Sequence, residues 1–142
     1  MGVEESVRDL CRKALGRDLR ESEGVSKEEV DQAAAGLGCA LESSLRAYYR
    51  CAGRADTLNS FHNEILVPQD WYLSEGHLVF MEENQGVVSW GLKVDADEEA
   101  TVWQRNNTSG AWHSEEKPLL VFLEDLFAWY AEGADFPPSV ED

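Results

Sequence analysis

The first third of the chain has apolar residues at helical spacing. Residues 3–15 carry an apolar stripe, which predicts an amphipathic helix. Ser26 and Glu29 form a capping-box pattern, so we expect a second helix to begin after Ser26. Residues 41–52 repeat the helical spacing with a pair of tyrosines and are followed by glycine. The sequence therefore begins with three predicted helices.

Beyond about residue 60 the apolar pattern becomes that of strands. The predicted strands span residues 65–67, 77–81, 87–94 and 100–105, while 111–113 is too short to assign. Pro118 then opens an apolar, aromatic helix that begins at residue 119 and is ended by Gly133. Helices, then strands joined by short turns, then a closing helix predict a single α+β domain with a mainly antiparallel sheet.

The stretch 81-MEENQGVVSWGL-92 has the pattern of a β-hairpin. Gly86 takes the positive-φ position of the turn, and the strand after it alternates apolar and small or polar residues. On this alternation Trp90 faces the core. Glu82 and Glu83 are neighbours on a strand and point to opposite faces, so they cannot act as a paired acid and base.

Charge is the strongest compositional signal. The 142 residues carry 28 acids and 12 Lys or Arg, a formal charge of −16. Residues 81–142 hold 14 of these acids and only three bases, a net charge of −11. Such a field repels phosphate backbones and anionic membranes and attracts basic proteins. The alternative is acidity that serves solubility alone.

Signatures of catalysis, cofactor binding and metal binding are missing. The sequence has no phosphate-binding loop, no GxSxG and no HExxH, and its three histidines lie far apart. Asp95, Asp97, Glu98 and Glu99 resemble a calcium loop in composition, but they lack the ligand spacing and mid-loop glycine of an EF-hand. A solvated acidic turn between strands is the favoured interpretation. We expect no enzyme activity, no cofactor and no metal.

The sequence also lacks the marks of export. No apolar run approaches the roughly 20 residues that span a bilayer, and the charged N-terminus does not resemble a signal peptide. Three cysteines without CxxC spacing are typical of reduced thiols. These features predict a cytoplasmic protein of undetermined oligomeric state.

The order of these motifs resembles the SUKH superfamily, which includes relatives of the yeast Smi/Knr cell-wall-synthesis regulator. The matching stretches are 41-LESSLRAYYRCAG-53, 65-ILVP-68, 76-GHLVFMEENQGVVSWGL-92, 102-VW-103, 110-GAW-112 and 119-LLVFLEDLFAWYA-131. The resemblance covers residues 26–132 and leaves out the opening segment 1–25 and the tail 133–142. It departs from the family at 41–52, which lacks the Leu-Pro start common there.

The resemblance implies an α+β fold with a central curved sheet and without catalytic machinery. Many bacterial members are thought to be immunity proteins that bind and neutralise toxins, often nucleases. By position, Trp90 matches the family's strand tryptophan, and Glu83-Asn84-Gln85 matches the polar turn before it.

Two functions follow from the sequence, with an unrecognised hydrolase as a third and least favoured alternative. The first is an immunity protein that binds a basic toxin, such as a nuclease, through an acidic surface. Its candidate contact residues are Glu82, Glu83, Asp95, Asp97, Glu98 and Glu99. The second is a regulatory or scaffolding domain that binds a protein in an aromatic groove. The candidate groove residues are Trp71, Tyr72, Trp103 and Trp112.

Overall fold

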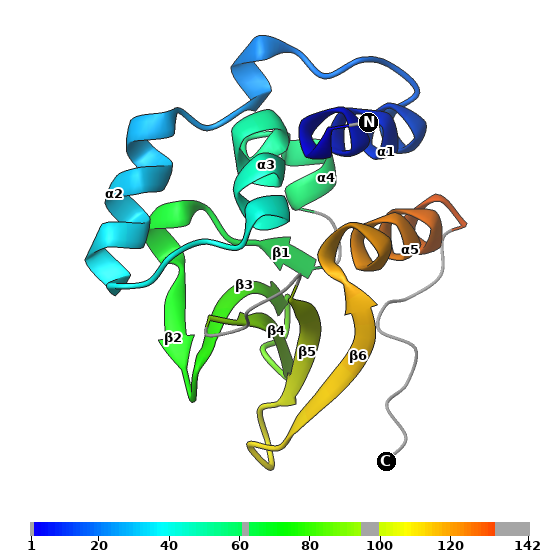
Figure 1. Cartoon of the computed structure of the whole chain (residues 1–142). Helices are drawn as coiled ribbons and strands as arrows, with labels where there is room; N and C mark the ends of the chain where they lie inside the picture. The colour runs from blue at the N-terminus through cyan, green and yellow to red at the C-terminus, as the bar shows by residue number, and fades with distance from the viewer. Residues whose placement is uncertain (1, 61–62, 95–99, 133–142) are drawn as a thin grey trace.

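The computed structural model of the chain describes residues 2–60, 63–94 and 100–132. The helices are α1 (Val3–Leu15), α2 (Lys27–Leu37), α3 (Ser43–Ala52), α4 (Asp56–Asn59) and α5 (Leu119–Ala131), with short 3-10 turns η1 (Glu21–Glu23) and η2 (Pro68–Asp70). The strands are β1 (Asn63–Ile65), β2 (Tyr72–Ser74), β3 (His77–Glu83), β4 (Val88–Lys93), β5 (Thr101–Asn106) and β6 (Trp112–Pro118). The predicted α+β class, with N-terminal helices and a C-terminal helix around an antiparallel sheet, is confirmed (Figure 1).

Helices α2 and α3 start where a side chain accepts hydrogen bonds from their free backbone N–H groups. The hydroxyl of Ser26 accepts a hydrogen bond from the backbone N–H of Glu29 at 3.2 Å, as the capping box predicts. Helix α3 starts two residues later than predicted, because Glu42 caps it. One carboxylate oxygen of Glu42 accepts from the backbone N–H groups of Ser44 and Leu45, each at 3.1 Å.

The sheet is antiparallel throughout and is built around β3. Strands β1 and β2 pair with different parts of one edge of β3, and β4, β5 and β6 follow on its other edge. Figure 1 shows the helices α1, α3, α4 and α5 gathered on one side of this sheet. The other side is therefore the place to look for exposed functional groups.

The sheet is strongly curled, because groups on distant strands touch. Arg105 on β5 donates a hydrogen bond to the hydroxyl of Ser74 on β2, at 2.6 Å, although β3 and β4 lie between them. In a flat sheet, three strand spacings would separate the two backbones by about 14 Å. Register shifts between Val79 and Met81 on β3 mark a bulge, which increases strand bending. We call the face over which β2 and β5 approach the concave face.

Gly91 on β4 is required at the centre of the curl. A Cβ at this position would lie 2.9 Å from the carbonyl oxygen of Leu78 and 3.2 Å from the Cβ of His77, both on β3. A side chain there would push β3 and β4 apart. The glycine thus permits the close approach on which the concave face depends.

The hydrophobic core fills the space between the helices and the opposite, convex face of the sheet. Phe122 on α5 contacts Phe80 on β3 and Trp90 on β4, with ring centroids 6.4 and 6.3 Å apart. Trp90 is fully buried, as its place in the alternating pattern predicts. Its indole N–H donates to a carboxylate oxygen of Glu115 on β6 at 3.2 Å.

Helix α1 lies outside the family resemblance, yet it is part of the same core. Its residues Val7, Leu10 and Cys11 are buried, and the helix packs against α3 and α5. The burial of Cys11 raises the pKa of its thiol to about 12. This cysteine is therefore a small apolar core residue in its chemistry.

The predicted elements differ from the structure in four details. The first strand covers Asn63–Ile65 instead of 65–67, and α4 and β2 were not predicted. Strand β6 extends over Trp112–Pro118, well beyond the short segment considered from the sequence. Its polar run lies at the edge of the sheet, where solvent replaces one side of the apolar pattern. Asp95, Asp97, Glu98, Glu99 and the tail 133–142 lie outside the described residues.

Candidate functional site

Polar and aromatic side chains meet on the concave face of the sheet. We call them the concave cluster: Tyr72, Ser74, His77, Glu82, Ser89, Trp103, Arg105 and Trp112. They come from β2, β3, β4, β5 and β6, and only the sheet brings them together. The register explains their common direction, because Ser89 pairs with Glu82 on one side and with Arg105 on the other.

Arg105 is the hub of the hydrogen bonds in the concave cluster. Its guanidinium donates to the side-chain oxygen of Asn107 at 2.7 Å, to the hydroxyl of Ser74 at 2.6 Å and to the hydroxyl of Tyr72 at 3.1 Å. A planar guanidinium has five N–H donors in a fixed fork and can hold several acceptors at once. Arg105 thus fixes β2 relative to β5.

Tyr72 links Arg105 to a carboxylate. The Tyr72 hydroxyl accepts from Arg105 and donates to Glu82 at 2.5 Å, while the Ser89 hydroxyl donates to the same Glu82 oxygen at 3.3 Å. Burial, and then the hydrogen bond to Glu82, raise the pKa of Tyr72. The Tyr72 proton is held in place, so the group acts as a spacer between two charges and not as a proton donor to a ligand.

An aromatic stack closes one end of the concave face. The rings of His77 and Trp112 lie parallel with centroids 3.8 Å apart, and Trp103 meets His77 edge-on at 5.6 Å. The indole N–H of Trp112 donates to the Glu75 carboxylate at 3.0 Å. The stack ties β6 to the turn between β2 and β3, across the width of the sheet.

His77 is the buried member of this stack and is only 5% exposed. Its Nδ1 lies 3.1 Å from the carbonyl oxygen of Glu75, and its Nε2 has no hydrogen-bond partner among the described residues. Burial lowers the pKa of the imidazole, with the nearby Lys93 acting in the same direction. The neutral form is the one that suits this position.

Two cationic side chains from residues 81–142 lie over aromatic rings. The ammonium of Lys93 lies 4.5 Å from the centre of the Trp103 ring. The guanidinium of Arg105 lies 5.4 Å from the ring centre of Trp112 and 6.0 Å from that of Tyr72. Such distances allow an attraction between the cation and the negative face of the ring. The concave face is thus suited to holding cations.

The two described acids among the predicted contact residues have structural partners. Glu82 lies inside the concave cluster, bonded to Tyr72 and Ser89. Glu83 accepts the backbone N–H of Val87 at 3.1 Å and closes the hairpin turn. The two carboxylates therefore have separate partners, as the strand geometry predicts. Asp95, Asp97, Glu98 and Glu99 are outside the described residues.

Of the four aromatic residues considered for a binding groove, the structure brings three together. Tyr72, Trp103 and Trp112 all belong to the concave cluster. Trp71 points elsewhere and packs edge-on against Tyr49 on α3, with ring centroids 4.8 Å apart.

Sequence reasoning did not identify His77 and Arg105 as members of a site. Both lie at positions that alternate with core residues on β3 and β5, so a correct strand register would have placed them on one face.

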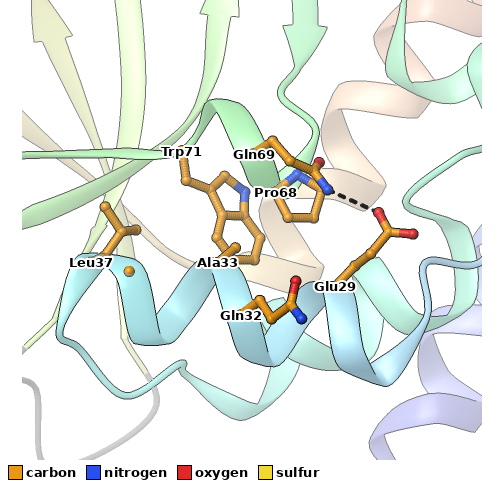
Figure 2. A pocket seen from close by; sticks show the side chains of 8 residues that line it. Glu29, Gln32, Ala33, Leu37, Pro68, Gln69 and Trp71 are labelled. Atoms are coloured by element: carbon orange, nitrogen blue, oxygen red, sulfur yellow. Dashed lines mark hydrogen bonds between the residues drawn. The ribbon is translucent and has the colours of Figure 1, made fainter.

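A separate cavity of about 340 Å³ lies between α2 and η2. Its lining residues are Glu29, Gln32, Ala33, Gly36, Leu37, Pro68, Gln69 and Trp71 (Figure 2). The carboxylate of Glu29 is already bound by Gln69 at 2.9 Å and by Arg54. The remaining walls are mainly small or apolar, and the buried indole N–H of Trp71 has no hydrogen-bond partner among the described residues. The cavity therefore has few polar groups that could orient a ligand.

Across residues 2–60, 63–94 and 100–132, no three His, Cys, Asp or Glu side chains are grouped so that they could hold a metal ion. In the same ranges, no helix has both the length and the apolar character needed to cross a bilayer.

Comparison with protein-family models, with curated proteins and with solved structures gives no match. The resemblance to the SUKH superfamily therefore rests on the sequence pattern alone and stays a prediction. What the chain does must be argued from the concave cluster and from the distribution of charge around it.

Proposed function

We propose that this chain is a non-catalytic protein-binding domain that captures a basic protein, most specifically an immunity protein that neutralises a basic toxin. A nuclease suits this role, because its active site attracts phosphate and so also attracts an acidic surface. The cytoplasm, where such a toxin acts, is the proposed location. The proposal requires no cofactor, metal or direct contact with nucleic acid.

The distribution of ion pairs is the observation that carries this proposal. Seven acids of the described chain form ion pairs with Lys or Arg, and all seven lie outside the strands: Asp9, Asp18, Glu23, Glu29, Asp31, Glu124 and Asp125. None of the six described acids on the strands and on the turn between β2 and β3 has such a partner: Glu64, Glu75, Glu82, Glu83, Glu115 and Glu116. Seven of the fifteen described acids elsewhere are thus paired with Lys or Arg, against none of these six, so a larger share of the carboxylates at the sheet lacks a neutralising base.

The proposed roles of the six candidate contact residues differ. Glu82 is engaged with Tyr72 and Ser89, so it supports the concave face and contributes its charge at a distance. Glu83 accepts a hydrogen bond from the backbone N–H of Val87 in the hairpin turn, so it too supports the fold and contributes its charge at a distance. The residues we propose for direct contact are Asp95, Asp97, Glu98 and Glu99, which follow the end of β4 and precede the start of β5 in the sequence.

The experiment co-expresses this chain with the product of the adjacent gene and measures cell growth. We expect the neighbour alone to inhibit growth and this chain to restore it by forming a stable complex. A neighbour that is harmless, or whose toxicity this chain leaves unchanged, would contradict the immunity function.

Association kinetics of the purified pair test the role of charge. Reversal of Asp95, Asp97, Glu98 and Glu99 to lysine should slow association and weaken its dependence on salt. The matched control reverses four exposed acids of the helical region, Glu4, Glu5, Glu21 and Glu28, with the same change in net charge. Equal association rates for the two variants would show that the position of the four acids is irrelevant.

A regulatory or scaffolding domain is the second candidate function. The gathering of Tyr72, Trp103 and Trp112 on one face favours it, since half-buried aromatic residues are common at protein-binding surfaces. The co-expression experiment separates the two, because a scaffold has no toxic neighbour to silence.

A further inference from the structure

We propose that the Trp103 ring is the seat for a lysine or arginine side chain of the basic partner, and that Lys93 occupies this seat in the free protein. The inference rests on the proposed function, since it assumes a basic partner. It adds the residue that receives the partner's cation and an internal competitor for that place.

The concave cluster already shows which kind of group its rings hold. Both Lys93 and Arg105 lie over rings of the cluster, at 4.5 Å from Trp103 and 5.4 Å from Trp112. The carboxylate of Glu75 borders the same end of the face, where it accepts from Trp112. Aromatic faces and carboxylates together favour a cationic guest over an anionic or neutral one.

Lys93 is the cation that a partner can replace. Arg105 is tied by hydrogen bonds to Ser74, Tyr72 and Asn107, and it holds the sheet in its curled form. The ammonium of Lys93 forms no ion pair in the described part of the chain, and its side chain is exposed. Its contact with Trp103 is therefore its main attachment, and a lysine has a flexible stem that lets the ammonium move into solvent.

When a cation of the partner replaces Lys93, the Trp103 ring still makes a cation–aromatic contact. In the free protein the ring holds Lys93, and in the complex it holds a cation from the partner. The partner must therefore displace Lys93 and also meets its positive charge. Removal of the Lys93 charge should therefore strengthen the binding of a basic ligand. This result is the opposite of what is expected when a residue that contacts the ligand is lost.

The test titrates octalysine into the intact protein and follows the indole N–H signals by NMR, with affinity measured by calorimetry. We expect the Trp103 indole signal to move. Lys93→Gln should bind octalysine more tightly than the parent by about 2- to 5-fold beyond the gain of the control, which is the size of an exposed cation–aromatic contact. The control is Lys13→Gln on α1, which makes the same change in net charge far from the sheet.

Trp103→Leu completes the cycle. In this background the extra gain from Lys93→Gln should disappear, because the seat is gone. A peptide of eight alternating Gly and Ser residues should leave the Trp103 signal unmoved in the parent protein. Circular dichroism checks that the leucine variant is folded. The comparison of Lys93→Gln with Lys13→Gln in the parent protein does not depend on this variant.

The outcomes separate this inference from the function on which it rests. If octalysine binds but Lys93→Gln and Lys13→Gln gain equally, or if the Trp103 signal does not respond, the seat is overturned while capture of basic partners stands. If octalysine does not bind the parent protein at all, the electrostatic part of the proposed function fails, and the seat fails with it.

Discussion

Arg105 on β5 donates a hydrogen bond to Ser74 on β2, at 2.6 Å, across two intervening strands. This contact closes the sheet over its concave face, where the same guanidinium lies 6.0 Å from the ring centre of Tyr72 and 5.4 Å from that of Trp112. A single guanidinium therefore holds both the shape of the fold and the candidate site.

Arg105→Met should destabilise the fold by about 1–3 kcal/mol, because it removes four hydrogen bonds donated by a charged group and leaves buried or half-buried acceptors unpaired. Urea unfolding measures the loss. Arg8→Met removes the same charge from an exposed position on α1 and should change the free energy of unfolding by less than about 0.5 kcal/mol. Equal effects of the two substitutions would contradict the role given to Arg105.

Gly91→Ala should destabilise the protein by about 1–3 kcal/mol or more, because the new Cβ meets backbone of β3 at 2.9 Å. Gly36→Ala is the matched control. Gly36 lies in α2 with open space around its Cβ position, so alanine should stabilise the helix by about 0.5–1 kcal/mol. Thermal unfolding of both variants tests the pair, and a harmless Gly91→Ala would show that the curl tolerates a side chain.

Trp90 and Trp103 should respond differently to truncation. Trp90→Ala removes a fully buried ring from the core and should cost about 3–5 kcal/mol. Trp103 is half-buried on the concave face, so Trp103→Leu should cost only about 1 kcal/mol. In this background Lys93→Gln should no longer raise the octalysine affinity beyond the gain of the Lys13→Gln control. Urea unfolding gives both values. A loss at Trp103 as large as that at Trp90 would place Trp103 in the core and not in a binding site.

Stability should fall as the pH is lowered from about 7 toward 5, because of His77. Burial lowers its pKa in the folded protein, so below the ordinary histidine value of about 6.5 the unfolded chain binds a proton that the folded chain does not. Protonation thus favours unfolding, and the His77 contribution is lost as pH falls from about 6.5 toward the folded pKa.

Urea unfolding at several pH values measures this slope. His77→Phe keeps a ring against Trp112 and should flatten the slope between pH 7 and pH 5.5, which leaves out most carboxylate titration. His113→Gln, at an exposed position of β6, should keep the slope of the parent protein. A parent slope that survives His77→Phe would assign the effect to another group.

The helices and the core side of the strands could be predicted because they depend on neighbours in sequence. The stripe of residues 3–15, the Ser26 cap and the alternation through Trp90 each leave a local pattern that the structure confirms. Most of strand β6 was missed because it has no such local pattern. It is an edge strand whose residues are mainly polar, so apolar and polar positions do not alternate along it.

The site could be predicted only in part. Tyr72, Trp103 and Trp112 stood out by residue type, and their meeting on one face follows from strand register. Arg105 and His77 gave no local signal, because one looks like a surface base and the other like the first residue of a strand. Glu82 was assigned to an external contact, and in the structure its carboxylate is bonded to Tyr72 and Ser89.

By itself the sequence determined the α+β class, the burial of Trp90 and the excess of acids in residues 81–142, since these follow from composition and from periods of two and 3.6 residues. The tertiary structure alone decided that the sheet curls until Arg105 reaches Ser74, and that Lys93 lies over Trp103. These contacts join residues on separate strands. They depend on bulges and on the close approach at Gly91, and neither leaves a periodic trace along the chain.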